Sequence, residues 1–182
     1  MKNDVTKVFL GGTVSDSKWR EWMIEHLDKM DGVTYYNPVV PIEELGPDFN
    51  KIYEKQLIDS HIKLFVFSPR MKAFFTLFEV MRSVFELGGT TIFCALKNDS
   101  IHYDHYGIAG PIPHFAGVSW QSLVDIGDEL KKRGCAVCYN LEDALKIINA
   151  LNTPIEITNE LLDELFEEER EKEELSTPQS LK

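Results

Sequence analysis

Short apolar segments alternate with longer amphipathic segments along most of this chain, and this alternation constrains the fold more than any other feature. The clearest apolar segment, Ile62 to Phe67 (IKLFVF), has the length of a β-strand and is followed by Ser68-Pro69. A nearly continuous apolar run is typical of a strand that is covered on both faces, as the strands of parallel sheets are. Such segments predict five strands, at residues 6–10, 33–36, 62–67, 90–96 and 135–139.

Amphipathic segments follow the strands and predict helices. Apolar residues recur at helical spacing from Trp19 to Leu27, and a serine or aspartate at positions 15–17 is expected to cap that helix. It should end near residue 30, and further helices are predicted at residues 49–60, 74–87, 118–133 and 141–151. Strands that alternate with helices form right-handed βαβ units. We therefore predict an α/β fold, a flavodoxin-like, doubly wound sheet of five mostly parallel strands in the order 2-1-3-4-5, with helices on both faces.

The predicted fold also says where a ligand should bind. In doubly wound sheets, ligands bind beyond the carboxyl ends of the strands, near the point where the strand order reverses. That rule selects Gly11-Gly12-Thr13, Asn37-Pro38 and residues 68–79. We expect the two glycines to stop the first strand and to let a ligand approach the backbone at the start of the next helix.

The formal charge of −11 is concentrated at one end of the chain. Residues 152–182 hold ten acidic and three basic residues, which contribute −7 and leave −4 for the preceding 151 residues. Broad binding to a phosphate backbone needs a basic surface, so the charge argues against a nucleic acid polymer as a partner. The charge does not argue against a small phosphorylated ligand, because backbone amides at a helix N-terminus can bind a phosphate group.

We predict one domain at residues 1–151 and an acidic C-terminal helix and tail at residues 152–182. The tail is expected either to dock through an amphipathic helix or to remain solvated, and a partner-binding role for it is a further hypothesis. The apolar runs are too short to cross a membrane, and the first residues do not have the pattern of a signal peptide. Three cysteines do not make a disulfide framework, which favours a cytoplasmic location.

Two carboxylates are candidates for chemistry. Glu79 follows the central strand and lies among aromatic residues in the segment FFTLFEVM, where it could act as a base or a nucleophile. Glu54 lies on the preceding predicted helix and could approach the same pocket from the other side. A solvated glutamate is the simpler interpretation of each. Two carboxylates near one sugar are nevertheless the usual apparatus for cleaving a glycosidic bond.

Three segments in order, KVFLGGTVSDSKWR, YYNPVVP and IKLFVFSP…TLFEV, make the chain resemble the nucleoside 2-deoxyribosyltransferase superfamily, and in particular its nucleoside 2-deoxyribosyltransferase-like branch. The resemblance covers about residues 5–150. It implies a flavodoxin-like fold and a retaining mechanism, in which a glutamate attacks the anomeric carbon of a 2-deoxyribosyl group. The base then leaves, and a second base or water resolves the covalent adduct.

The resemblance also implies roles for individual residues. Glu79 stands at the position of the nucleophile, and Glu54 lies near the acidic residue that helps to protonate the leaving base. A homodimer or larger homo-oligomer is implied as well, with a nucleoside or nucleotide as the small-molecule partner. The residues that match the substrate-binding segments, or lie beside the nucleophile, are Gly11, Gly12, Thr13, Tyr36, Asn37, Pro38 and Thr76.

The leading hypothesis is therefore cleavage of an N-glycosidic bond in a nucleoside or nucleotide, with transfer to another base or to water, and it requires no metal and no cofactor. Ala73 and His61 stand where the family often has other residues, which motivates the alternative of a non-catalytic protein that binds or senses a nucleotide in the same pocket. The residues His102, Asp104, His105 and His114 match no strong metal-binding spacing. Cys135 and Cys138 should point to opposite faces of a strand and be buried.

Overall fold

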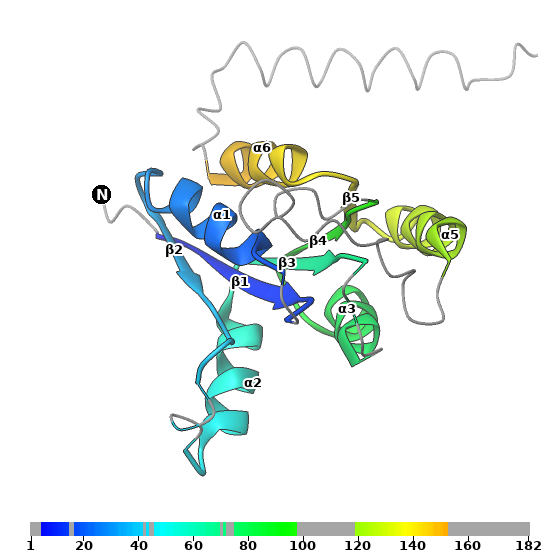
Figure 1. The fold of residues 1–182 in the computed structure, drawn as a ribbon. Helices are drawn as coiled ribbons and strands as arrows, with labels where there is room; N and C mark the ends of the chain where they lie inside the picture. Colours follow the sequence, from blue (N-terminus) through cyan, green and yellow to red (C-terminus); the bar gives the residue numbers. More distant parts are fainter. Residues whose placement is uncertain are drawn as a thin grey trace, which may run out of the picture. The chain divides into compact units, whose positions relative to one another are not determined.

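The computed structural model describes residues 5–14, 17–41, 43, 46–69, 71, 75–97 and 119–152. In this part of the chain, strands and helices alternate as the sequence predicts (Figure 1). The strands are β1 (Thr6–Gly12), β2 (Val33–Tyr36), β3 (Ile62–Phe67), β4 (Thr90–Ala95) and β5 (Ala136–Cys138). The helices are α1 (Trp19–Leu27), α2 (Phe49–Asp59), α3 (Phe75–Glu86), α5 (Trp120–Lys131) and α6 (Leu141–Asn152).

The five strands form one parallel sheet in the order β2-β1-β3-β4-β5. This confirms the predicted doubly wound, flavodoxin-like α/β fold. The strand order reverses beside β1, because the chain passes from β1 to β2 on one side and returns to β3 on the other. The carboxyl ends of β1 and β3 therefore flank the place where such folds bind ligands.

Helices α1 and α6 cover one face of the sheet and form what we call the α1/α6 layer. The side chains of Val8, Leu64 and Ile92 point into it from three neighbouring strands. Trp19 and Met23 of α1 are fully buried against them. Helical spacing thus buries one side of α1, as the sequence predicts.

Helices α2, α3 and α5 cover the opposite face and form the α2/α3/α5 layer. Its core is aromatic, with Phe9, Phe65, Phe67 and Phe93 all buried on this face of the strands. The rings of Phe67 and Phe93 lie 4.8 Å apart between centroids. Because successive side chains of a strand alternate between faces, Leu64 and Phe65 belong to different layers.

Two local predictions are wrong. The first strand does not stop at the glycines, because β1 continues through Gly11 and Gly12, which pair with Phe65 and Val66 of β3. A Cβ atom on Gly12 would lie 2.2 Å from the Val66 carbonyl oxygen, so glycine here permits a close approach between strands. Helix α1 begins after Lys18, which makes no side-chain cap hydrogen bond, rather than directly after a cap at residues 15–17.

A buried lysine connects α2 and α3 at the amino end of the sheet. The Lys63 ammonium group donates hydrogen bonds to the carbonyl oxygen of Ser60, at 2.8 Å, and to that of Gly88. Ser60 caps the C-terminus of α2, and Gly88 follows the C-terminus of α3. One cation therefore satisfies carbonyl groups at the ends of two helices, where positive charge is favourable.

The cysteine prediction is confirmed, since Cys135 and Cys138 are free, buried and packed in opposite layers. Within the described residues, no helix has the length and apolar character that crossing a membrane requires. Several sequence predictions fall outside the described residues. These are the segment around Ala73, the histidine-rich loop from residue 98 to 118, and the acidic segment from residue 153 onward.

Candidate functional site

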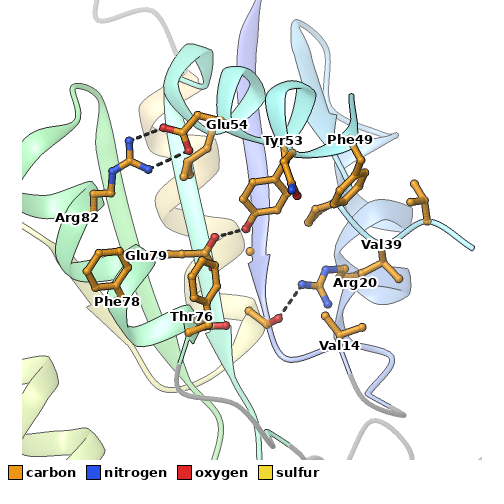
Figure 2. Close-up of a pocket in the computed structure, with 17 residues that line it drawn as sticks. Val14, Arg20, Val39, Phe49, Tyr53, Glu54, Thr76, Phe78, Glu79 and Arg82 are labelled. Carbon is orange, nitrogen blue, oxygen red and sulfur yellow. Dashed lines mark hydrogen bonds and ion pairs between the residues drawn. The ribbon is translucent and has the colours of Figure 1, made fainter. Parts of the chain in front are cut away.

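A pocket of about 700 Å³ opens at the carboxyl ends of β1 and β3, on the side of α2 and α3 (Figure 2). Strand β1 contributes its two glycines, and helices α2 and α3 contribute five residues each, between Phe49 and Leu57 and between Phe75 and Arg82. The lining residues are Gly11, Gly12, Val14, Arg20, Pro38, Val39, Val40, Phe49, Asn50, Tyr53, Glu54, Leu57, Phe75, Thr76, Phe78, Glu79 and Arg82. The predicted switch-point location is thus hollowed out in the structure.

Glu79 is the buried carboxylate of this pocket. It lies in the first half of α3 and is only 6% exposed to solvent. Its Oε1 accepts a hydrogen bond from the hydroxyl of Tyr53. Burial, together with the negative charge of Glu54, raises the pKa of Glu79 above the usual range. The Tyr53 hydrogen bond and the positive charges of Arg20 and Arg82 oppose this rise. The site therefore holds a poorly hydrated carboxylate whose ionisation depends on its neighbours.

Tyr53 connects α2 to Glu79, and its ring is fixed by aromatic neighbours. The Phe9 ring meets it edge-on at 5.3 Å between centroids, and the Phe49 ring lies 6.0 Å away. Burial raises the pKa of Tyr53, and the hydrogen bond to Glu79 adds to the effect. The phenol therefore remains protonated across the physiological range and acts as a donor.

Glu54 has a different environment from Glu79. Its carboxylate forms a two-point ion pair with Arg82 of α3, with 2.9 Å between Arg82 Nη1 and Glu54 Oε2, and its side chain is 40% exposed. The Arg82 hydrogen bonds lower the pKa of Glu54. Figure 2 shows the two side chains joined between α2 and α3. Glu54 is therefore ionised at neutral pH, whereas Glu79 binds a proton more readily.

Arg20 reaches the pocket from α1 and fixes the end of β1. Its buried guanidinium donates to the carbonyl oxygens of Leu10 and Gly12, both at 3.0 Å, and to that of Thr13. Burial lowers the pKa of Arg20 to about 10, so the side chain keeps its charge at neutral pH. The indole of Trp19 donates to the same Thr13 carbonyl at 2.9 Å. These bonds hold the backbone that forms one wall of the pocket.

The structure brings most of the predicted site residues to one place. Of the described residues, those that both carry a predicted role and line the pocket are Gly11, Gly12, Pro38, Glu54, Thr76 and Glu79.

Three other predicted residues are placed beside the pocket rather than in its lining. The hydroxyl of Thr13 is buried, donates to the Val66 carbonyl at 3.2 Å and accepts from the Ser68 amide at 3.0 Å. Tyr36 stacks on Phe9, and Asn37 accepts a hydrogen bond from the Val39 amide. His61 Nδ1 accepts a hydrogen bond from the Lys7 amide, at 3.0 Å, at the amino end of the sheet, so His61 is remote from the pocket.

Sequence reasoning missed Tyr53, Arg20 and Arg82 as parts of the site. Tyr53 directly precedes Glu54, and one tyrosine on an amphipathic helix matches no motif. Arg20 carried a usable signal, because it lies in the first turn of α1, where the helix dipole disfavours a cation. A basic residue that contradicts its local setting indicates a compensating tertiary contact. Arg82 follows Glu79 by three positions, so the two share one side of the helix.

The described residues contain no cluster of three or more histidine, cysteine, aspartate or glutamate side chains that could hold a metal ion. The pocket instead combines one buried carboxylate, a phenol donor and aromatic walls from Phe49, Phe75 and Phe78. Carboxylates with aromatic surfaces suit a ligand that has both a flat ring and an electrophilic carbon.

Comparison of the chain with protein-family models, with curated proteins and with solved structures finds no match.

Proposed function

We propose that the protein cleaves the N-glycosidic bond of a nucleoside or nucleotide, with Glu79 as the nucleophile, and transfers the glycosyl group to another base or to water. The observation that carries this proposal is the buried Glu79 carboxylate, held by Tyr53 inside the pocket at the reversal of strand order. The resemblance of the sequence to the nucleoside 2-deoxyribosyltransferase superfamily supports the same reaction.

The environment of Glu79 suits a nucleophile. A carboxylate that has lost most of its hydration is more reactive toward carbon than a solvated one. Arg20 and Arg82 supply positive charge that opposes the effect of burial on its pKa. Attack on the anomeric carbon would form a glycosyl ester, and the glycosidic nitrogen would take the electron pair of the broken bond.

Glu54 fits the role of an orienting group or a base. Its ion pair with Arg82 keeps the pKa low, so it carries no proton to donate to a leaving base at neutral pH. Its fixed charge beside Glu79 can instead orient a sugar hydroxyl or a water molecule. Aromatic side chains of the pocket provide flat surfaces for a nucleobase.

The test is incubation of the purified full chain with a panel of nucleosides, nucleotides and nicotinamide dinucleotides, followed by chromatography of the free bases. We expect base release from at least one substrate, and an adduct on the peptide that contains Glu79 after rapid acid quench and mass spectrometry. Glu79→Ala should lower the rate by roughly 10³-fold or more, because a positioned reacting group is lost.

Glu25→Ala is the matched control, because Glu25 is exposed on α1 and pairs only with Lys29 among the described residues. It should leave the rate unchanged. A Glu79→Ala protein with full activity would overturn the assignment of the nucleophile. Tight binding of a panel compound without any base release would favour the alternative, a protein that binds or senses a nucleotide in this pocket.

A further inference from the structure

We propose that Tyr53 is a positioning residue that determines which oxygen of Glu79 attacks the sugar and stabilises the carboxylate when the glycosyl adduct is resolved. This inference rests on the proposed function of Glu79. Its starting observation is the hydrogen bond from the Tyr53 hydroxyl to Glu79 Oε1, which joins α2 to α3 across the pocket (Figure 2).

The two oxygens of Glu79 have different surroundings. Oε1 accepts the Tyr53 hydrogen bond, and no described residue donates a hydrogen bond to Oε2. An oxygen that already accepts a hydrogen bond has lower electron density available for attack. The geometry therefore assigns Oε2 as the attacking atom and Oε1 as the oxygen that becomes the ester carbonyl.

The position of the Tyr53 hydroxyl is fixed by packing. Phe9 and Phe49 contact its ring, and Phe9 is itself fully buried in the aromatic core of the α2/α3/α5 layer. A ring held on two sides has few accessible rotamers, so its donor is in place before a substrate binds. Preorganised donors of this kind are effective because they need no rearrangement during the reaction.

In the first step, Glu79 Oε2 donates an electron pair to the anomeric carbon. The bond from this carbon to the glycosidic nitrogen breaks, the pair remains on the base, and the base takes a proton from water. Tyr53 keeps its own proton throughout, since burial and Glu79 both raise its pKa. Tyr53 therefore acts as a hydrogen-bond donor and not as the acid of this step.

In the second step, the oxygen of a water molecule or the nitrogen of another base attacks the anomeric carbon. The bond to Oε2 breaks, its electron pair returns to Glu79, and the attacking water or base loses its proton to solvent. Negative charge develops on both carboxylate oxygens, so the Tyr53 hydrogen bond to Oε1 becomes stronger as the adduct decays. Loss of this bond should slow the second step more than the first.

The pH dependence follows from all the charged groups that face Glu79. Arg20 from α1 and Arg82 from α3 favour its ionised form, and Glu54 from α2 disfavours it. Tyr53 is the only described group that lowers the pKa of Glu79 by a hydrogen bond. Without this bond, burial is opposed only by the two arginines, so the pKa of Glu79 rises. Activity needs the ionised carboxylate, so the acid limb of the kcat/KM profile should move to higher pH.

The test compares wild type, Tyr53→Phe and Tyr35→Phe as full-length proteins. Tyr53→Phe removes the hydroxyl and keeps the ring that packs on Phe9 and Phe49. Tyr35→Phe is the matched control, because it also removes one tyrosine hydroxyl, but Tyr35 packs in the α1/α6 layer on the opposite face of the sheet. Circular dichroism and thermal unfolding verify that both variants fold.

Three readouts are measured with the substrate that releases base from wild type. For Tyr53→Phe we expect the acid limb at higher pH, a decay of the Glu79 adduct that is slower by roughly tenfold or more, and more adduct at steady state. Tyr35→Phe should match wild type in each. A Tyr53→Phe protein with the wild-type pH profile and wild-type adduct decay would overturn the inference.

A substrate-free measurement separates this inference from the proposed function. Carbon-13 NMR of labelled glutamate side chains follows the titration of Glu79, which is assigned by its absence from Glu79→Gln. Tyr53→Phe should raise the pKa of Glu79 relative to wild type. An unchanged titration would overturn the role of Tyr53 even if wild type is active. A raised pKa in a protein that releases no base would support the contact and overturn the function instead.

Discussion

The two layers around the sheet differ in how completely the helices cover it. In the α1/α6 layer, Trp19, Met23 and Ile148 are fully buried against aliphatic side chains of the strands. In the α2/α3/α5 layer, the aromatic core is equally buried, but a pocket separates α2 from α3 at the carboxyl end of the sheet. Its α3 wall leaves Phe75 and Phe78 66% and 63% exposed.

The difference shows how one fold combines a stable core with a reactive group. The α1/α6 layer contributes burial, which is the dominant favourable term in folding. The α2/α3/α5 layer holds Glu79 in a poorly hydrated place, which costs free energy but provides a carboxylate suited to chemistry. Loss of a buried apolar side chain should therefore destabilise the fold, whereas loss of the Glu79 charge should stabilise it.

The largest expected effect is the loss of a large aromatic side chain from the α1/α6 layer. Trp19→Ala should lower the free energy of unfolding by about 3–5 kcal/mol, because the indole is fully buried and donates to the Thr13 carbonyl. Phe78→Ala in the other layer should cost no more than about 0.5 kcal/mol, because its ring is mostly exposed. Urea unfolding of both variants gives the comparison, and equal losses would contradict it.

An intermediate effect is expected at the junction between the layers. Gly12 has a φ of +119°, and an added Cβ atom would meet the Val66 backbone at 2.2 Å. Gly12→Ala should therefore lower the free energy of unfolding by about 1–3 kcal/mol, mainly through backbone strain. Gly88→Ala is the control, because a Cβ there meets no atom within 4 Å. Thermal unfolding compares the two, and an unaffected Gly12→Ala protein would show that β1 can move away from β3.

The smallest effect has the opposite sign and depends on pH. Glu79→Gln should raise the free energy of unfolding at pH 7 by about 1 kcal/mol, because it removes a buried charge that costs stability. The folded-state pKa of Glu79 is raised, so the folded protein binds a proton more tightly than the unfolded chain does. The contribution of Glu79 to the free energy of unfolding is therefore greatest at pH values below the usual carboxyl pKa. This contribution decreases as the pH rises from the usual carboxyl pKa through the folded-state pKa.

Denaturant unfolding of wild type and Glu79→Gln at several pH values measures this dependence. The advantage of the variant should shrink as pH falls toward the usual carboxyl range. An advantage that stayed constant with pH would mean that Glu79 ionisation does not contribute to it.

The fold could be predicted from the sequence because burial on both faces makes the strands apolar throughout. The strands Ile62–Phe67 and Thr90–Ala95 are almost entirely buried. For both strands, the ends predicted from the sequence agree with the structure to within one residue. The end of β1 was mispredicted, because glycine stops some strands and permits close approach between others. Only the pairing with Val66 distinguishes these two cases.

The site could be predicted only to the extent that topology determines it. The strand order brings the carboxyl ends of β1 and β3 side by side, and Gly12 and Glu79 line the pocket found there. The partners of the two glutamates follow instead from how α2 and α3 rotate about their axes, which the sequence pattern does not specify. Glu54 was expected near Glu79 and is found in the same pocket, but its direct partner is Arg82.

Lys63 links the two helices that supply most of the pocket lining. Its ammonium group fixes the C-terminal ends of α2 and α3 to one point at the amino end of the sheet. The pocket extends to the other ends of these helices, where Phe49 begins α2 and Phe75 begins α3. A relative rotation of the two helices about the Lys63 end would have its largest amplitude at the opposite end, where the pocket opens. The hydrogen bond between Tyr53 and Glu79 joins the two helices on the pocket side of Lys63, so such a rotation would lengthen it.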